Sequence, residues 1–162
     1  MKKILLLLIA VLTLAGPVHA QKGRASKKEQ IAGAVARTMM NKRLVIYISN
    51  VMSEWGNQNY NPGLKVTLIN DKFTCNLPYQ GSSRINTYGS QDLYIKAEDV
   101  PVDITSDFNN KKGFYEIKFN FTSTYDNEPF DVSMKVFVNG KVTMQVNSPK
   151  RSNMRYSGGL EL

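Results

Sequence analysis

A regular alternation of apolar and polar residues fills most of the chain beyond residue 43, and it constrains the fold more than any other feature. In residues 115–121 every second side chain is apolar (Tyr115, Ile117, Phe119 and Phe121). The same period recurs in residues 130–138 and 142–146. A period of two is typical of a β-strand with one face against a core and the other in water. These segments therefore predict antiparallel strands around a single core.

Turn-forming residues separate the alternating segments. Asn70-Asp71 lies between two of them, and Asn139-Gly140 lies between two others. Asn-Gly favours a short hairpin because both residues tolerate positive φ. Shorter apolar patterns predict further strands at residues 44–48, 93–97, 102–108 and 154–160. The chain is thus predicted to be all-β and mainly antiparallel, a meander of about eight or nine strands that forms a sandwich or a curved, barrel-like sheet.

One short N-terminal helix is expected before the first strand. Ser26-Lys27-Lys28-Glu29 has the S-x-x-E pattern of a capping box, in which the Ser hydroxyl and the Glu carboxylate satisfy free amides of the first turn. Apolar residues then recur at helical steps, at Ile31, Val35 and Met39. We predict a helix that begins at Ser26 and closes one end or one open side of the sheet.

The first 20 residues have the pattern of a secretory signal peptide. Two lysines precede an apolar run from Ile4 to Ala15, and small residues follow Gly16-Pro17. The run is shorter than the roughly 20 residues of a membrane helix. We expect cleavage after Ala20 and no transmembrane segment in the mature chain. The protein would then be exported, to the periplasm, the cell surface or the medium.

Removal of the signal peptide would limit the kinds of catalysis and metal binding that the mature chain can perform. The single histidine is His19, so the mature chain would have none, which excludes Ser-His-Asp and Cys-His catalysis and histidine metal ligands. Cys75 is the only cysteine and cannot form an intramolecular disulfide. Its place on an apolar strand face indicates a buried, structural thiol. We expect no metal and no cofactor.

The positive charge is concentrated near the N-terminus. The formal net charge is +8, and residues 21–43 hold seven bases against one acid. From residue 44 to 162 there are 12 bases and 12 acids. We therefore divide the chain into a signal peptide (1–20), a basic arm with the helix (21–43) and an antiparallel β domain (44–162). Such an arm is typically solvated, or it binds an anionic lipid or polymer. Export argues against nucleic acid as a partner.

Two stretches combine aromatic and polar residues in a way that suits ligand binding. Residues 55–63 pair aromatics with amides, and residues 79–91 form a long, Gly- and Ser-containing segment. Aromatic rings can stack on the apolar faces of sugars while amides bind their hydroxyls. The candidate ligand-binding residues are Trp55, Asn57, Asn59, Tyr60, Tyr79, Arg84 and Tyr88. The alternative is that both stretches are plain turns whose aromatics cover the rim of the core.

Four carboxylates within ten residues offer a second possible chemistry. They are Glu98, Asp99, Asp103 and Asp107. Two of them could act as a glycosidase pair, or several could bind calcium. Acidic residues on a strand also serve as a solvated edge that discourages edge-to-edge pairing. No catalytic residue is assigned from this pattern.

Several short motifs together resemble a family of exported proteins of Gram-negative bacteria known as domain of unknown function 4251. They are the signal peptide and basic lead, Leu77-Pro78-Tyr79 with Gly81, Asn139-Gly140, Ser148, Arg151, and the closing Tyr156-Ser157-Gly158 with Leu160-Glu161. The resemblance spans nearly all of the mature chain. It implies an all-β exported domain, and it brings no established activity, substrate or site.

These observations favour a non-catalytic binding or interaction domain of the cell envelope. Its partner would be a small ligand, a glycan or an envelope protein, and we expect a monomer. Two alternatives stay open. One is a hydrolase that uses two of the four clustered carboxylates, and the other is a structural envelope component whose basic arm binds an anionic lipid or polymer.

Overall fold

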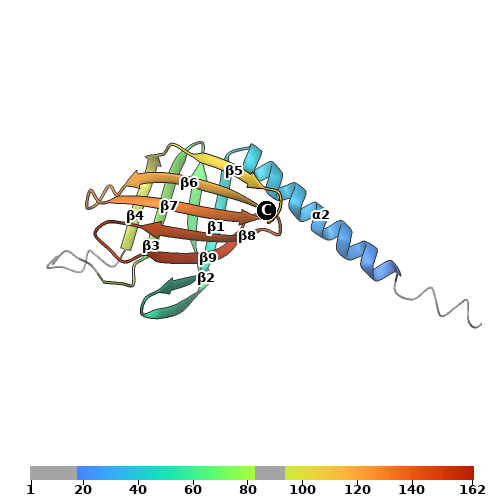
Figure 1. Cartoon of the computed structure of the whole chain (residues 1–162), viewed down its shortest axis with the longest axis horizontal. Coiled ribbons are helices and arrows are strands. Elements are labelled where there is room, and N and C mark those ends of the chain that lie inside the picture. The colour runs from blue at the N-terminus through green and yellow to red at the C-terminus, as the bar shows by residue number, and fades with distance from the viewer. Residues whose placement is uncertain (1–17, 83–93) are drawn as a thin grey trace, which may run out of the picture.

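The computed structural model describes residues 18–82 and 94–162, which form one helix and a nine-stranded sheet (Figure 1). The elements are α2 (Val18–Met40), β1 (Arg43–Ser53), β2 (Gly56–Ile69), β3 (Lys72–Pro78), β4 (Tyr94–Pro101), β5 (Thr105–Asn109), β6 (Phe114–Thr122), β7 (Pro129–Phe137), β8 (Lys141–Asn147) and β9 (Met154–Leu160).

The sheet has the order β4-β3-β2-β1-β9-β8-β7-β6-β5, and each pair of neighbours is antiparallel. The sheet curls into a half-barrel (Figure 1). Consecutive strands β4 and β5 therefore lie at its two edges. The prediction of an all-β antiparallel domain with about nine strands is confirmed, and of its two architectures the curved sheet is the one formed.

The concave face of the half-barrel holds the core. Phe73 on β3 contacts two rings of β6, with centroid distances of 4.9 Å to Phe119 and 5.0 Å to Phe121. Strands from the two halves of the sheet thus pack face to face across the interior. Cys75 is buried in this core, as predicted from its apolar neighbours.

The two predicted turns differ in geometry. Asn70 and Asp71 both have positive φ (51° and 60°) and join β2 to β3 as a two-residue hairpin turn. Of the other pair, Gly140 has positive φ (81°), and its N–H donates to the carbonyl of Phe137 over 2.9 Å. The β7–β8 connection is one residue longer than the expected turn. The Asn139 side chain accepts the N–H of Lys141 (3.1 Å), which stabilises this wider form.

The helix begins earlier than the capping pattern predicted. It starts at Val18, directly after Pro17, and runs through Ser26 without a break. The start at Ser26 was wrong because no proline lies between residues 18 and 26 and the helix continues through Gly23. Val35 is fully buried, and Ile31 and Met39 pack against the core, so the predicted apolar stripe faces the sheet. The N-terminal part extends away from the sheet (Figure 1). Within the described ranges no helix is long and apolar enough to span a membrane.

Residues 56–63, expected as a loop, belong to strand β2. They lack alternation because most of their side chains are polar, but they pair with the end of β1. The pairing shifts between Ile48 and Asn50, so that residues 60–63 of β2 stand opposite Ser49 alone. The turn between the strands consists of Glu54 and Trp55.

Candidate functional site

The outer ends of β1 and β2 form a two-stranded arm, residues 50–59, called here the hairpin arm. Asn50 pairs with Asn59 and Ser53 with Gly56. Because Val51 is fully buried, its neighbours Asn50 and Met52 face away from the core. Their cross-strand partners Asn59 and Asn57 share that outer face. The amide of Asn50 donates to the side-chain oxygen of Asn59 over 2.8 Å, which fixes both amides.

The outer face of the arm continues across three more strands without a break in register. Met52 pairs with Arg155, Arg155 with Gln145, and Gln145 with Ser133. We call the resulting line of side chains the outer row: Asn57, Met52, Arg155, Gln145 and Ser133. At the usual strand spacing it spans roughly 19 Å.

A parallel line lies beside the outer row on the same face. This second row consists of Asn59, Asn50, Ser157, Thr143 and Lys135. Two hollows of about 220 and 190 Å³ open on this face, and Arg155 and Gln145 line both of them. The surface therefore offers amides, hydroxyls and a guanidinium around two depressions. Such groups bind hydroxyls and anions.

The tip of the hairpin arm is fastened to neighbouring segments through Glu54. Its carboxylate accepts hydrogen bonds from the hydroxyl and the N–H of Ser82 (2.6 Å from the amide nitrogen) and from the hydroxyl of Ser152 (3.0 Å). The hydrogen bonds from Ser82 and Ser152 lower the pKa of Glu54 below its ordinary value. The side chain of Gln80 also donates to that of Gln58 on the arm. The arm is thus held on one flank as well as at its root.

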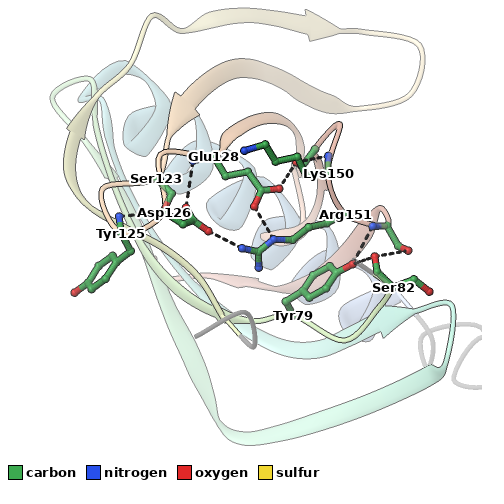
Figure 2. A network of polar contacts seen from close by, with 10 residues as sticks. Tyr79, Ser82, Ser123, Tyr125, Asp126, Glu128, Lys150 and Arg151 are labelled. Atoms are coloured by element: carbon green, nitrogen blue, oxygen red, sulfur yellow. Dashed lines mark hydrogen bonds and ion pairs between the residues drawn. The ribbon is translucent and has the colours of Figure 1, made fainter. Parts of the chain in front are cut away.

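A buried polar network lies under this attachment (Figure 2). Arg151 is 5% exposed, and its Nε donates to Glu128 over 2.7 Å while Nη2 donates to Asp126 over 2.6 Å. The hydroxyl of Ser148 donates to the same Glu128 carboxylate. The guanidinium also lies 5.2 Å from the ring centroid of Tyr79. Arg151 therefore connects the β6–β7 loop, the β8–β9 loop and the end of β3.

Tyr79 links that network to Glu54. Its hydroxyl donates to the carbonyl of Ser82 (2.6 Å) and accepts the N–H of Ser152 (2.9 Å) (Figure 2). A Cβ at Gly81 would lie only 2.9 Å from this hydroxyl, so the close approach requires glycine. These contacts place the hairpin arm on a rigid, internally hydrogen-bonded base.

The structure places the candidate ligand-binding residues of the two stretches in different surroundings. Asn57 and Asn59 lie on the outer face, and Trp55 is 71% exposed at the turn. Tyr60 packs against the core, and this burial raises its pKa. Tyr79 is buried in the base of the arm.

Arg84 and Tyr88, the other two candidates, lie outside the described residues. Sequence reasoning missed Met52, Arg155 and Gln145, because their alignment depends on the pairing of distant strands. The sequence held one signal for these three residues: each of them follows an apolar residue along its strand, which places it on the outer face.

The four clustered carboxylates lie on the two edge strands of the sheet and on the segment that connects them. Glu98 and Asp99 are on β4, Asp107 is on β5 and Asp103 lies between these strands. All four are exposed, and Glu98 and Asp103 line different hollows. Across residues 18–82 and 94–162, no three His, Cys, Asp or Glu side chains gather as around a metal ion.

Burial raises the pKa of Cys75 to about 12, so it is a neutral thiol at physiological pH.

The fold and this surface define an all-β half-barrel domain with a polar outer face. The sequence pattern of the family "domain of unknown function" (DUF4251) matches residues 26–160, and the chain belongs to that family. A solved relative is a DUF4251 family protein from Bacteroides eggerthii DSM 20697, which is 15% identical in sequence. The match covers 80% of this chain and 86% of that one, with a TM-score of 0.56, and it shows a common fold. No curated protein matches the chain.

Proposed function

We propose that this protein is a non-catalytic binding domain of the bacterial cell envelope and that it binds a hydroxyl-rich, anionic glycan on its outer face. One observation carries the proposal. Asn57, Met52, Arg155 and Gln145 stand in register on four successive strands of the sheet, and Arg155 and Gln145 border two hollows. A line of this kind matches a polymer, whose repeating groups meet similar side chains at successive strands.

The side chains of the face suit such a ligand chemically. The amides of Asn57 and Gln145 each donate and accept, as sugar hydroxyls do. The guanidinium of Arg155 can hold a carboxylate with two parallel hydrogen bonds. Trp55, exposed at the turn next to the row, offers a ring on which the apolar face of a sugar can stack.

The rigid base favours binding as well. Glu54 and the buried Arg151 network hold the hairpin arm in one arrangement before any ligand arrives. Little conformational entropy is then lost when a ligand binds. Arg84 and Tyr88 are proposed to contribute from the segment that follows Ser82.

Export is the second part of the proposal, and it rests on residues 1–20. Cleavage after Ala20 would remove the first three residues of α2 and leave the basic arm, 21–43, ahead of the β domain, 44–162. The expected location is the periplasm, the cell surface or the medium. N-terminal sequencing of the protein recovered from the envelope and the medium tests this. A chain that still begins at Met1 in the cytoplasm would contradict it.

The binding proposal is tested by calorimetric titration with polygalacturonate oligomers, and with dextran oligomers as the uncharged counterpart. We expect binding of the anionic oligomers, weakened by Arg155→Gln and by Asn57→Ala. Lys72→Gln is the matched control, because Lys72 is exposed on β3, away from both rows. Equal affinity for dextran, equal effects of Lys72→Gln and Arg155→Gln, or no heat with either polymer would overturn the proposal.

A further inference from the structure

A second site lies at the other end of the half-barrel, where α2 joins β1. A cavity of about 160 Å³ opens there. Its apolar lining comes from five separate parts of the fold: Met39 of α2, Leu44 of β1, Leu68 of β2, Ile104 before β5, and Ile117 of β6. The cavity thus lies between strands β1 and β2 on one side and strands β5 and β6 on the other, next to the C-terminal end of α2.

The residues that form the walls of this cavity are held by burial in the core and by backbone hydrogen bonds between the neighbouring segments. Leu44, Leu68 and Ile117 are each at most 3% exposed and belong to the core. The nearby segments are joined by backbone hydrogen bonds: the N–H of Val102 donates to the carbonyl of Asp71 over 2.9 Å, and the N–H of Asn70 donates to that of Lys42 over 3.0 Å. The cavity is therefore preformed, as ligand pockets usually are.

Its size sets the apolar part of a ligand. An apolar cavity of about 150 Å³ in a protein core binds benzene. The present cavity is slightly larger, so it accepts one ring or a short alkyl chain. It is too small for a steroid or a long acyl chain.

The residues at the rim of the cavity determine which polar group a ligand can carry. Lys42 and Asp71 line the cavity and form an exposed ion pair with an Nζ–Oδ2 distance of 2.8 Å, and Ser106 adds a hydroxyl. The ammonium of Lys42 has three N–H donors, so it can bind a second carboxylate beside Asp71. Arg37 and Arg43 stand close to Lys42 in the chain and add positive charge at this end of the molecule, which favours an anion.

We propose that this cavity binds a small monocarboxylate with an apolar body of about six carbons. The apolar body fills the space among Met39, Leu68 and Ile117, and the carboxylate meets Lys42 and Ser106 at the rim. This site is separate from the outer face, and it stands or falls independently of the glycan proposal.

The test is a titration of methyl-labelled protein with phenylacetate, followed by NMR. Two analogues of the same shape accompany it, the neutral 2-phenylethanol and the cationic phenethylamine. We expect shifts of the Met39, Ile104 and Ile117 methyl signals. Phenylacetate should bind about three- to fivefold more tightly than the alcohol, the ratio expected for one exposed charge pair.

Variants separate the two parts of the site. Lys42→Gln should remove the advantage of phenylacetate over the alcohol and leave the affinity for the alcohol unchanged, while Lys141→Gln, exposed on β8, should change neither. Ile104→Phe should fill the cavity and abolish both. If Ile104→Phe fails to fold, Lys42→Gln still decides. Tighter binding of phenethylamine, shifts confined to other methyls, or no shifts up to the solubility limit would overturn the proposal.

Discussion

Arg151 and Glu128 form an ion pair in the interior of the protein, with 2.7 Å between Nε and Oε2 and side-chain exposures of 4% and 5%. The pair joins the β8–β9 loop to the β6–β7 loop, and through Tyr79 it reaches the segment that holds Glu54. The hairpin arm is therefore linked to the segments around the buried ion pair by hydrogen bonds, in addition to its strand pairing.

Loss of Arg151 should destabilise the fold strongly. In Arg151→Met the carboxylate of Glu128 stays buried without its guanidinium partner, and breaking a buried pair in this way costs about 3–5 kcal/mol. Urea unfolding measures the change. The control is Lys42→Met, which breaks an exposed pair and should cost less than about 1 kcal/mol. Similar losses in the two variants would contradict a structural role for the buried network.

Two neighbouring glycines should respond in opposite ways to the same substitution. A Cβ at Gly158 would lie 2.0 Å from the carbonyl oxygen of Tyr47 and 2.8 Å from the Cα of Ile48, so β1 would have to move. At Gly159 the nearest atom would be 4.0 Å away. We expect Gly158→Ala to lower the unfolding free energy by about 3 kcal/mol or more, or to prevent folding. Gly159→Ala should be tolerated, and equal thermal stability of the two variants would refute this close approach.

The carboxyl of Glu54 should titrate below its ordinary pKa of 4.5, because Ser82 and Ser152 hydrogen-bond its charged form. Because the pKa of Glu54 is lower in the folded protein than in the unfolded chain, these hydrogen bonds stabilise the protein above pH 4.5. The stabilisation is lost as the pH falls through the pKa of the folded state. Carboxyl NMR measures the titration. Ser152→Ala should raise the midpoint toward 4.5. A wild-type midpoint at or above 4.5 would show that the Glu54 attachment is absent in solution.

Cys75 should be inert toward alkylation until the protein unfolds. Burial raises its pKa from 9.0 to about 12, so the folded protein holds almost no thiolate near neutral pH. Because the folded pKa is the higher one, stability should fall as the pH rises above 9.0 and the unfolded thiol ionises. Mass spectrometry after iodoacetamide treatment, with and without urea, gives the result. Rapid modification of the native protein would mean that the core around Cys75 is open.

The strands were predictable where one face is apolar. The alternation around Phe119 predicts strand β6, and Asn70-Asp71 predicts the turn between β2 and β3. Both patterns depend only on residues close together in the sequence, and both elements are observed. The first strand residues of β2, near Asn57, have polar side chains on both faces, so only pairing with β1 makes them a strand. Ser26 has a capping pattern, but a helix arriving from Val18 needs no cap there.

The candidate site was less predictable than the fold. Arg155 and Gln145 meet Met52 only because β9 lies between β1 and β8, and strand order is not encoded in local periodicity. Whether the strands form a sandwich or one curved sheet also depends on strand order, because the order decides which strands lie at the edges. Tyr79 is a further example: its place in a polar segment of the sequence predicts a ligand contact, and the fold buries it beside Arg151, a position that local sequence does not indicate.

Asn57, Arg155 and Gln145 of the outer row and Asn59 of the second row are proposed to bind an anionic glycan. The most direct test is to follow the side-chain NH₂ signals of Asn57, Asn59 and Gln145 by ¹⁵N NMR during titration with polygalacturonate oligomers. These signals, and the Nε–H of Arg155, should shift together and saturate at one ligand concentration. Shifts confined to the carboxylate strands β4 and β5, or to the basic arm, with the outer row unchanged, would contradict it.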